Sequence, residues 1–145
     1  MGTLGLSTIT TALETALRDA PQLEGVHVTQ ELDDPTADQC PAVIIRVGPL
    51  RWEERHLAAR DPDSGTAFIT MSFGLQCVEF SAQSIEKART LRDTLLDSAI
   101  AVLKRNRQVG GVLDLRITGI EPVPGPPSDG IFSAAIINVE AEKFV

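Results

Sequence analysis

Two histidines and two cysteines are the side chains of this sequence that most often perform acid–base or nucleophilic chemistry. His27 falls on the polar side of an alternating segment and His56 falls in a highly charged one, and neither belongs to a motif that supplies a partner. Cys40 precedes a proline and Cys77 lies on the apolar side of a predicted strand, without Cys-x-x-Cys spacing. We therefore interpret the histidines as surface residues and the cysteines as buried or half-buried thiols.

The acidic segments are also weak candidates for a site. The segment 61–65 (DPDSG) resembles a calcium loop, but its glycine comes one position early and Ser72 stands where the closing acid is required. A second acidic group lies in a predicted turn and consists of Asp33, Asp34 and Asp38. We interpret both as turns with solvated acids, and a weak cation site at the second turn is the alternative. Because GxSxG, P-loop and GxGxxG motifs are absent too, we expect no catalytic residue, no metal site and no cofactor.

The segment from Leu50 to Gly65 has the one tryptophan of the chain, Trp52, among charges of both signs. We predict a long hairpin arm with its tip at 61–65; a solvated helical turn is the alternative, since part of the segment has helical propensity. Trp and Arg are enriched as anchors of protein–protein contacts. The arm and a later proline-rich loop therefore supply the candidate interface residues, which are Arg51, Trp52, Glu53, Glu54, Arg55, Arg60, Pro124, Pro126 and Asp129. The competing interpretation folds Trp52 back over its own sheet.

A long alternating segment must position these residues. From Thr66 to Phe80, one set of alternate residues is almost entirely apolar, which predicts a strand with one buried face. That set consists of Ala67, Ile69, Met71, Phe73, Leu75, Cys77 and Glu79. Apolar residues near both ends of the other set predict that the outer face is partly covered, and Gly74 predicts a bend or bulge.

The segment from Ser84 to Arg105 has apolar residues three and four positions apart, which predicts an amphipathic helix about 33 Å long. Shorter patterns predict a helix over 7–19, strands over 25–32, 42–47, 112–120 and 131–145, and an exposed connection with four prolines over 121–130. The order is α-β-β-β-α-β-β. Because short links favour antiparallel pairing, we predict an α+β fold with a mainly antiparallel sheet of about five strands and two helices packed on one face.

The composition is that of a single globular domain spanning residues 1–145. Hydrophobic residues make up 43% of the chain and charged residues 23%, and the formal net charge is −7. An acidic balance argues against wrapping of nucleic acid but permits a surface that duplex DNA passes without sticking. No segment approaches the roughly 18 apolar residues of a membrane span, and the N-terminus lacks a signal-peptide pattern, so we expect synthesis in the cytoplasm and no membrane partner.

Four segments resemble a known family. They are TALETAL in the opening helix, PAVIIRVGP in the second strand, TAFITMSFGLQCVEFSAQSIEKARTLRDTLLDSAIAVL in the long strand and helix, and IFSAAIINVEAEKF in the last strand. In their order and in their residue pattern, these segments resemble the tail terminator (tail-completion) proteins of long-tailed bacteriophages, of prophages and of gene-transfer particles. The likeness covers almost the whole chain and is one of pattern, because that family is not defined by invariant residues.

The resemblance implies a structural virion protein of the tail or neck, without catalysis. It implies a homo-oligomer, a hexameric ring, that caps the tail tube, ends its polymerisation and joins the tail to the head connector. Its partners would be the tail tube protein on one side and a connector or neck protein on the other, and genomic DNA would pass through without specific binding. The alternatives are another neck or head–tail joining protein and, in a different class, a small α+β ligand-binding domain or enzyme with an unrecognised site.

Overall fold

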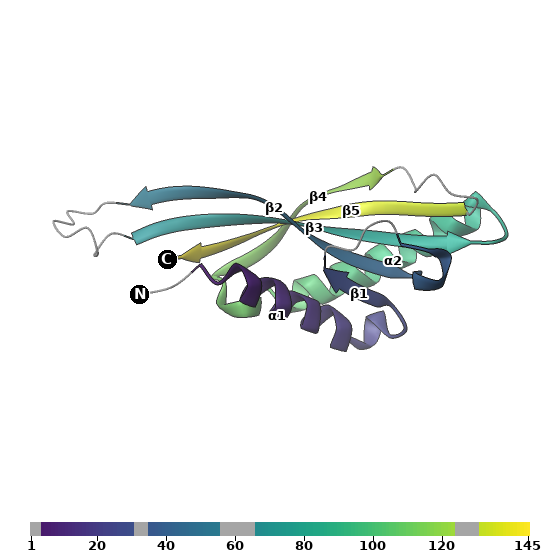
Figure 1. Ribbon diagram of the computed structural model, residues 1–145, viewed down its shortest axis with the longest axis horizontal. Helices are drawn as coiled ribbons and strands as arrows, with labels where there is room; N and C mark the ends of the chain where they lie inside the picture. The colour runs from purple at the N-terminus through teal and green to yellow at the C-terminus, as the bar shows by residue number, and fades with distance from the viewer. Residues whose placement is uncertain (1–3, 31–34, 56–65, 124–130) are drawn as a thin grey trace.

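The computed structural model describes residues 4–30, 35–55, 66–123 and 131–145 (Figure 1). Within these ranges, two helices and five strands follow one another in the predicted order. They are α1 (Leu6–Asp19), β1 (His27–Gln30), β2 (Ala42–Arg55), β3 (Thr66–Ser81), α2 (Ile85–Arg105), β4 (Asp114–Val123) and β5 (Ile131–Phe144), with short 3₁₀ turns at η1 (Pro21–Leu23), η2 (Ala37–Gln39) and η4 (Val109–Gly111). The predicted α+β fold class and the order of elements are confirmed.

The strands form one sheet in the order β1-β2-β3-β5-β4. The pairs β2–β3, β3–β5 and β5–β4 are antiparallel, as predicted, whereas β1 pairs parallel with β2. The expectation from short links is wrong for β1, because β2 starts at the end of the sheet at which β1 also starts, with His27 opposite Ala42. A parallel pair requires a crossover, whereas a tight hairpin produces an antiparallel one.

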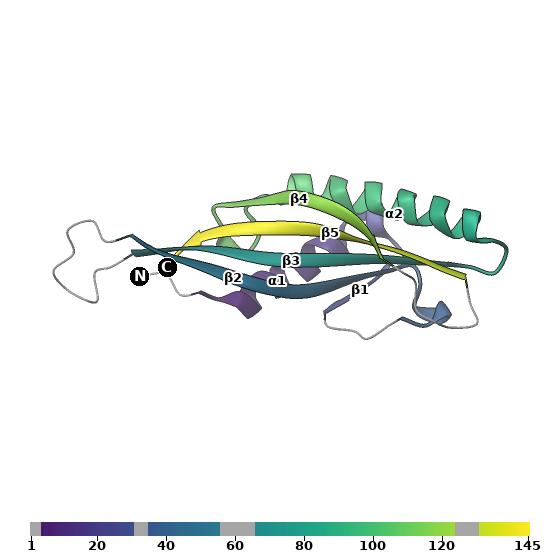
Figure 2. The same ribbon diagram turned by 90° about the horizontal axis from the view of Figure 1, so that it is seen from above.

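Both helices pack on the same face of the sheet; in Figure 1, α1 lies below the strands and α2 runs behind them. Figure 2 shows α2 along the β4 side of the sheet and α1 under the β2–β3 side. Their apolar stripes form one core with alternate residues of the strands. In β3 every residue of the predicted inward set is buried, and the members that join this core are Ile69, Met71, Phe73, Leu75 and Cys77. The prediction that two helices cover one face is confirmed.

The long helix begins and packs as its sequence predicts. The Ser84 hydroxyl accepts a hydrogen bond from the backbone N–H of Lys87 at 3.1 Å, which satisfies one of the unpaired donors of the first turn. Most of the predicted stripe is buried against the sheet, whereas Ile85 at its start is exposed; the buried members are Ala88, Leu95, Leu96, Ala99, Val102 and Leu103. After the helix, Gly110 has a left-handed backbone (φ 64°), and η4 packs against α1.

The second strand is longer than predicted. We expected it to stop at Gly48-Pro49, but β2 continues to Arg55 with a shift of register between Val47 and Leu50. A bulge at this point leaves residues unpaired, so the missing N–H of a proline is tolerated in a strand at the side of a sheet. The strand that the hairpin arm required before its tip is therefore confirmed over 50–55. The helical alternative concerned residues 54–60, of which 54 and 55 belong to the strand; residues 56–60 and the tip lie outside the described residues.

Two other local predictions are corrected. Gly74 forms no bulge in β3, which pairs regularly through this residue with Arg46 and Asn138. A β-carbon at Gly74 would lie 3.2 Å from the Cγ2 atom of Ile136, so the glycine makes room for a neighbouring side chain. The fourth strand extends to Val123, into a segment that we assigned to an exposed connection. Its proline is tolerated because β4 is an edge strand.

The outer face of the sheet is partly covered, as predicted. A small second cluster of Ile44, Val78 and Ala134 is buried on this face. Next to it, the rings of Phe80 and Phe132 lie 5.1 Å apart. Most of the remaining outer face is polar, so the sheet has one apolar, helix-covered side and one largely hydrophilic side.

Candidate assembly surfaces

The part of β2 over 46–55, here called distal β2, forms an edge of the sheet. β1 pairs only with Ala42 to Ile45. Beyond Ile45, no strand in the described ranges pairs with the edge of β2 that points away from β3. Figures 1 and 2 show the ends of β2 and β3 extending past both helices. A sheet edge presents backbone donors and acceptors that can pair with another chain, so distal β2 is a candidate contact surface.

Distal β2 also exposes large apolar side chains. Trp52 is 56% exposed and Leu50 is 43% exposed. They lie opposite Ile69 and Met71, which are core residues, so both belong to the helix-bearing face of the sheet. Trp52 is not part of the core itself. Its exposure favours the interpretation of Trp52 as a contact residue over the one that folds it back over its sheet.

The charged neighbours of Trp52 alternate with it along the strand. Arg51 lies opposite Thr70 on the outer face, and its guanidinium donates a hydrogen bond to the Thr70 hydroxyl at 3.4 Å. Glu53 is on the same face, opposite Phe68. Glu54 and Arg55 are the last two residues of β2. The other predicted interface residues lie outside the described residues, namely Arg60, Pro124, Pro126 and Asp129.

The opposite edge of the sheet is β4, which pairs with β5 alone among the described strands. Two exposed apolar side chains belong to this edge: Ile120, which is 45% exposed, and Leu113, which is 48% exposed just before the strand. Ile120 lies opposite Ile137, a core residue, so it belongs to the helix-bearing face. Sequence reasoning did not single out either residue, because the exposure of a strand residue depends on which strand ends the sheet.

Ion pairs fix the polar side of β4. Arg116 reaches Glu140 at 3.0 Å and Glu142 at 2.7 Å on the neighbouring strand. Arg107 donates two hydrogen bonds to Asp114, each 2.9 Å long. The hydrogen bond from Arg107 is the largest effect that holds the pKa of Asp114 below its ordinary value. The start of β4 is therefore tied both to β5 and to the end of α2.

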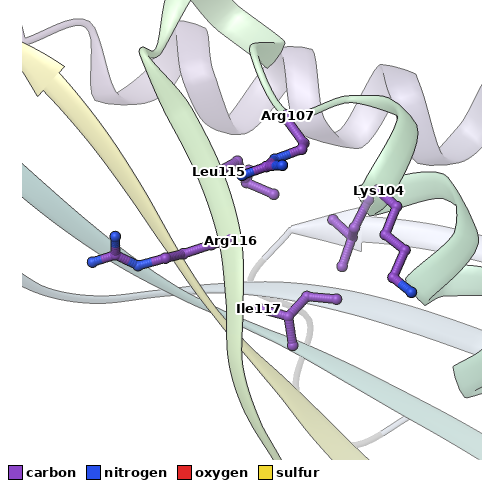
Figure 3. Close-up of a pocket in the computed structure, with 6 residues that line it drawn as sticks. Lys104, Arg107, Leu115, Arg116 and Ile117 are labelled. Atoms are coloured by element: carbon purple, nitrogen blue, oxygen red, sulfur yellow. The ribbon is translucent and has the colours of Figure 1, made fainter.

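A shallow hollow of about 260 Å³ lies between the end of α2 and β4 (Figure 3). Apolar atoms form its floor and cations its rim; it is lined by Leu103, Lys104, Arg107, Leu115, Arg116 and Ile117. In Figure 3 the Arg116 side chain extends away from Lys104, toward the other side of β4.

The two cysteines lie at buried or half-buried positions, as predicted. Cys77 is buried, and burial raises the pKa of its thiol to about 12. Burial and the nearby charge of Glu79 raise the pKa of the half-buried Cys40 thiol to about 11. Burial also raises the pKa of Glu79. Both thiols are thus protonated at neutral pH, and their positions confirm the interpretation as buried or half-buried thiols.

The remaining sequence candidates do not converge on one place. His27 is exposed at the start of β1, as predicted, and Asp38 is exposed in η2. His56, Asp33, Asp34 and the segment 61–65 lie outside the described residues. Across the part of the chain that the structure describes, no three His, Cys, Asp or Glu residues gather in a metal-binding arrangement. Nor does either described helix have the length and apolar character to cross a membrane.

Comparison with known proteins adds a likeness of fold. No protein-family model and no curated protein matches the sequence. Among solved structures, the fold is similar to a chain of the virion of a native gene transfer agent (GTA) particle, with a TM-score of 0.53 and 12% sequence identity. The match covers 97% of this chain and 98% of that chain. At this identity the likeness shows a shared fold over nearly the full length of both chains.

Proposed function

We propose that this protein is a structural component of a phage-like virion, and more specifically the tail terminator that caps the tail tube as a ring. The observation that carries the proposal is the end-to-end fold match with a chain of a gene transfer agent virion. The match covers 97% of this chain and 98% of that chain, so it supports a common architecture over almost the full length of both. The sequence resemblance to tail terminators points to the same class independently of the structure.

The surfaces of the molecule support a role in assembly. Both edges of the sheet expose apolar side chains, Leu50 and Trp52 at one edge and Ile120 at the other. A protein with different surfaces at its two edges can make head-to-tail contacts, and such contacts form a ring when the rotations of successive copies close on the first copy, and an open filament when they do not. A ring of six copies would end tube growth by covering the surface to which the next tube ring binds, and its far side would join the connector.

The electrostatics support passage of DNA without adhesion. The chain has a formal net charge of −7, so a ring of several copies is strongly acidic. Proteins that hold DNA neutralise its phosphates with lysine and arginine, and the same field with the opposite sign keeps a duplex away from the wall. The proposed partners are therefore a tail tube protein and a neck or connector protein, with DNA as cargo in transit.

The test is the assembly state of the purified protein, measured by native mass spectrometry with and without isolated tail tubes. A species of six times the 15.6 kDa chain mass, or rings seen by electron microscopy at tube ends, is the expected result. Rings that bind an isolated head connector and ignore tubes would identify another neck protein instead. A monomer that binds neither tubes nor connectors would overturn the proposal.

A further inference from the structure

We infer that distal β2 of one copy docks alongside β4 of the next copy, so that neighbouring sheets join edge to edge with Trp52 as the apolar anchor. The inference rests on the proposed ring and names the surfaces that would form it. Its occupant is a second copy of this chain, bound head to tail.

The strand directions favour this contact. Along the sheet, β2, β3, β5 and β4 each run opposite to their neighbour, so β2 and β4 run in opposite directions. When two copies stand side by side in the same orientation, β2 of one therefore meets β4 of the other in the antiparallel sense. Antiparallel pairs outnumber parallel ones, and they need no crossover to connect them.

The exposed apolar residues lie on matching faces. Leu50 and Trp52 lie on the helix-bearing face, and so does Ile120. Leu113 precedes Leu115 by two positions, and Leu115 lies opposite Ala141 in the core. Joining the edges at equal levels would bring Trp52 of one copy beside Leu113 of the next, whereas Ile120 is level with Ile45 and would meet β1 of the neighbour. Buried aromatic anchors surrounded by smaller contacts are the usual pattern of interface hot spots.

The strand register also shows which residues of the two edges lie at the same position along the strand direction. Through Thr70 and Glu142, the register places Arg51 of β2 at the same level of the sheet as Asp114 of β4. In an unstaggered junction, Arg51 would meet the Asp114 of the neighbour on the outer face, and Trp52 would meet Leu113 on the helix-bearing face. A carboxylate that already accepts bonds from Arg107 has acceptor sites left for a second arginine.

The irregular parts of both edges limit where another chain can pair. β2 bulges between Val47 and Leu50, and β4 is irregular between Ile117 and Gly119. Bulges and prolines protect sheet edges from indiscriminate pairing. The regular stretches that remain are 50–55 in β2 and 114–117 in β4, and both lie at the same end of the sheet. At equal levels only Leu50 and Arg51 of the first stretch face the second stretch, opposite Leu115 and Asp114, so regular pairing would be confined to a short junction at this end of the sheet.

The test is a mixing experiment with one edge blocked in each variant. The first variant carries Leu50→Asp and Trp52→Asp, and the second carries Leu113→Asp and Ile120→Asp. The control is Ile85→Asp, which changes a 42% exposed isoleucine at the start of α2, on neither edge strand. Circular dichroism and thermal unfolding check that each variant is folded. A milder pair, Trp52→Ser and Leu113→Ser, repeats the experiment if an aspartate variant does not fold.

Under conditions in which the wild type assembles, alone or on tail tubes, we expect each blocked variant to be monomeric and their equimolar mixture to form a dimer and nothing larger. The dimer joins the intact β4 edge of the first variant to the intact β2 edge of the second. As the chain has one tryptophan, assembly of the wild type should also shift its fluorescence to shorter wavelengths, because Trp52 leaves water.

Three results would overturn the inference. If the second variant dimerises alone, the contact joins two copies of β2 to each other. If both variants form the wild-type assembly, the edges are not the contact, although the proposed ring stands. If the tryptophan emission is unchanged on assembly, Trp52 is not the anchor. Failure of the wild type to assemble even on tail tubes rejects the proposed function itself, which keeps the two failures distinct.

Discussion

Replacement of Gly110 by alanine should destabilise the protein through a clash between η4 and α1. Gly110 has a φ of 64°, and a β-carbon there would lie 3.0 Å from the Cα atom of Ile9. That atom belongs to the backbone of α1, so the contact cannot be relieved by a side-chain rotation. Gly111 is the matched control, because it has a φ of 81° in the same turn and nothing within 4 Å of an added β-carbon.

Both variants lose free energy of unfolding because alanine must adopt a left-handed backbone. Only Gly110→Ala also brings a β-carbon against the backbone of α1. A left-handed backbone costs a non-glycine residue about 1–2 kcal/mol, and the smaller entropy of the unfolded alanine chain returns about 0.4–1 kcal/mol. Gly111→Ala should therefore lose about 1 kcal/mol of unfolding free energy. Gly110→Ala should lose a further amount of about 1–3 kcal/mol, which is typical of overpacking against a fixed neighbour.

Urea unfolding followed by circular dichroism measures this difference. For an m-value of about 2 kcal/mol/M, the midpoint of Gly110→Ala should lie about 0.5–1.5 M below that of Gly111→Ala. Equal midpoints would refute the reasoning, since they would show that α1 and η4 separate at no cost. A lower m-value in one variant would instead indicate a change of the unfolded or native ensemble, and the comparison would then use unfolding calorimetry.

Three further predictions concern the core, an ion pair and a thiol. Leu95→Asp places a carboxylate at a position that is 5% exposed in the middle of the α2 stripe. It should lower the free energy of unfolding by about 4 kcal/mol or more, as the most damaging single substitutions do. A native circular dichroism spectrum would contradict the core assignment. Arg107→Gln should raise the pKa of Asp114 toward its ordinary value in an NMR titration. Because that pKa is depressed in the folded protein, the pair stabilises the wild type above the unfolded pKa of Asp114, and this stabilisation should disappear as the pH falls through the folded pKa. The Cys77 thiol should not react with a thiol reagent at pH 8 until urea unfolds the chain; rapid native labelling would show that it is accessible.

Patterns that repeat along the chain predicted most of the fold. The alternation over 66–80 and the stripe over 84–105 each extend for more than a dozen residues, so single exceptions do not obscure them. Gly48-Pro49 misled because these residues usually end a strand, and only the edge position of β2 lets it continue past them. The parallel pairing of β1 depends on where the chain returns, which local sequence does not encode.

The candidate surfaces were predictable only in part. Trp52 stood out by its residue type and its charged neighbours, and the structure places it at an exposed edge. Leu113 and Ile120 have nothing unusual in sequence, and they matter only because β4 ends the sheet. The bonds of Arg116 to Glu140 and Glu142 likewise require two strands that come from separate parts of the chain.

The position of β5 determines when this protein can fold during synthesis. β5 is the last strand along the chain, yet it lies inside the sheet and pairs with both β3 and β4. Until a ribosome has released it, β3 lacks one neighbour and β4 has none. The nascent chain thus passes through a stage in which an apolar central strand is open to other chains, and completion of the domain depends on a distant strand arriving last. Pairing over such separations slows folding, so we expect a requirement for chaperones while synthesis is under way.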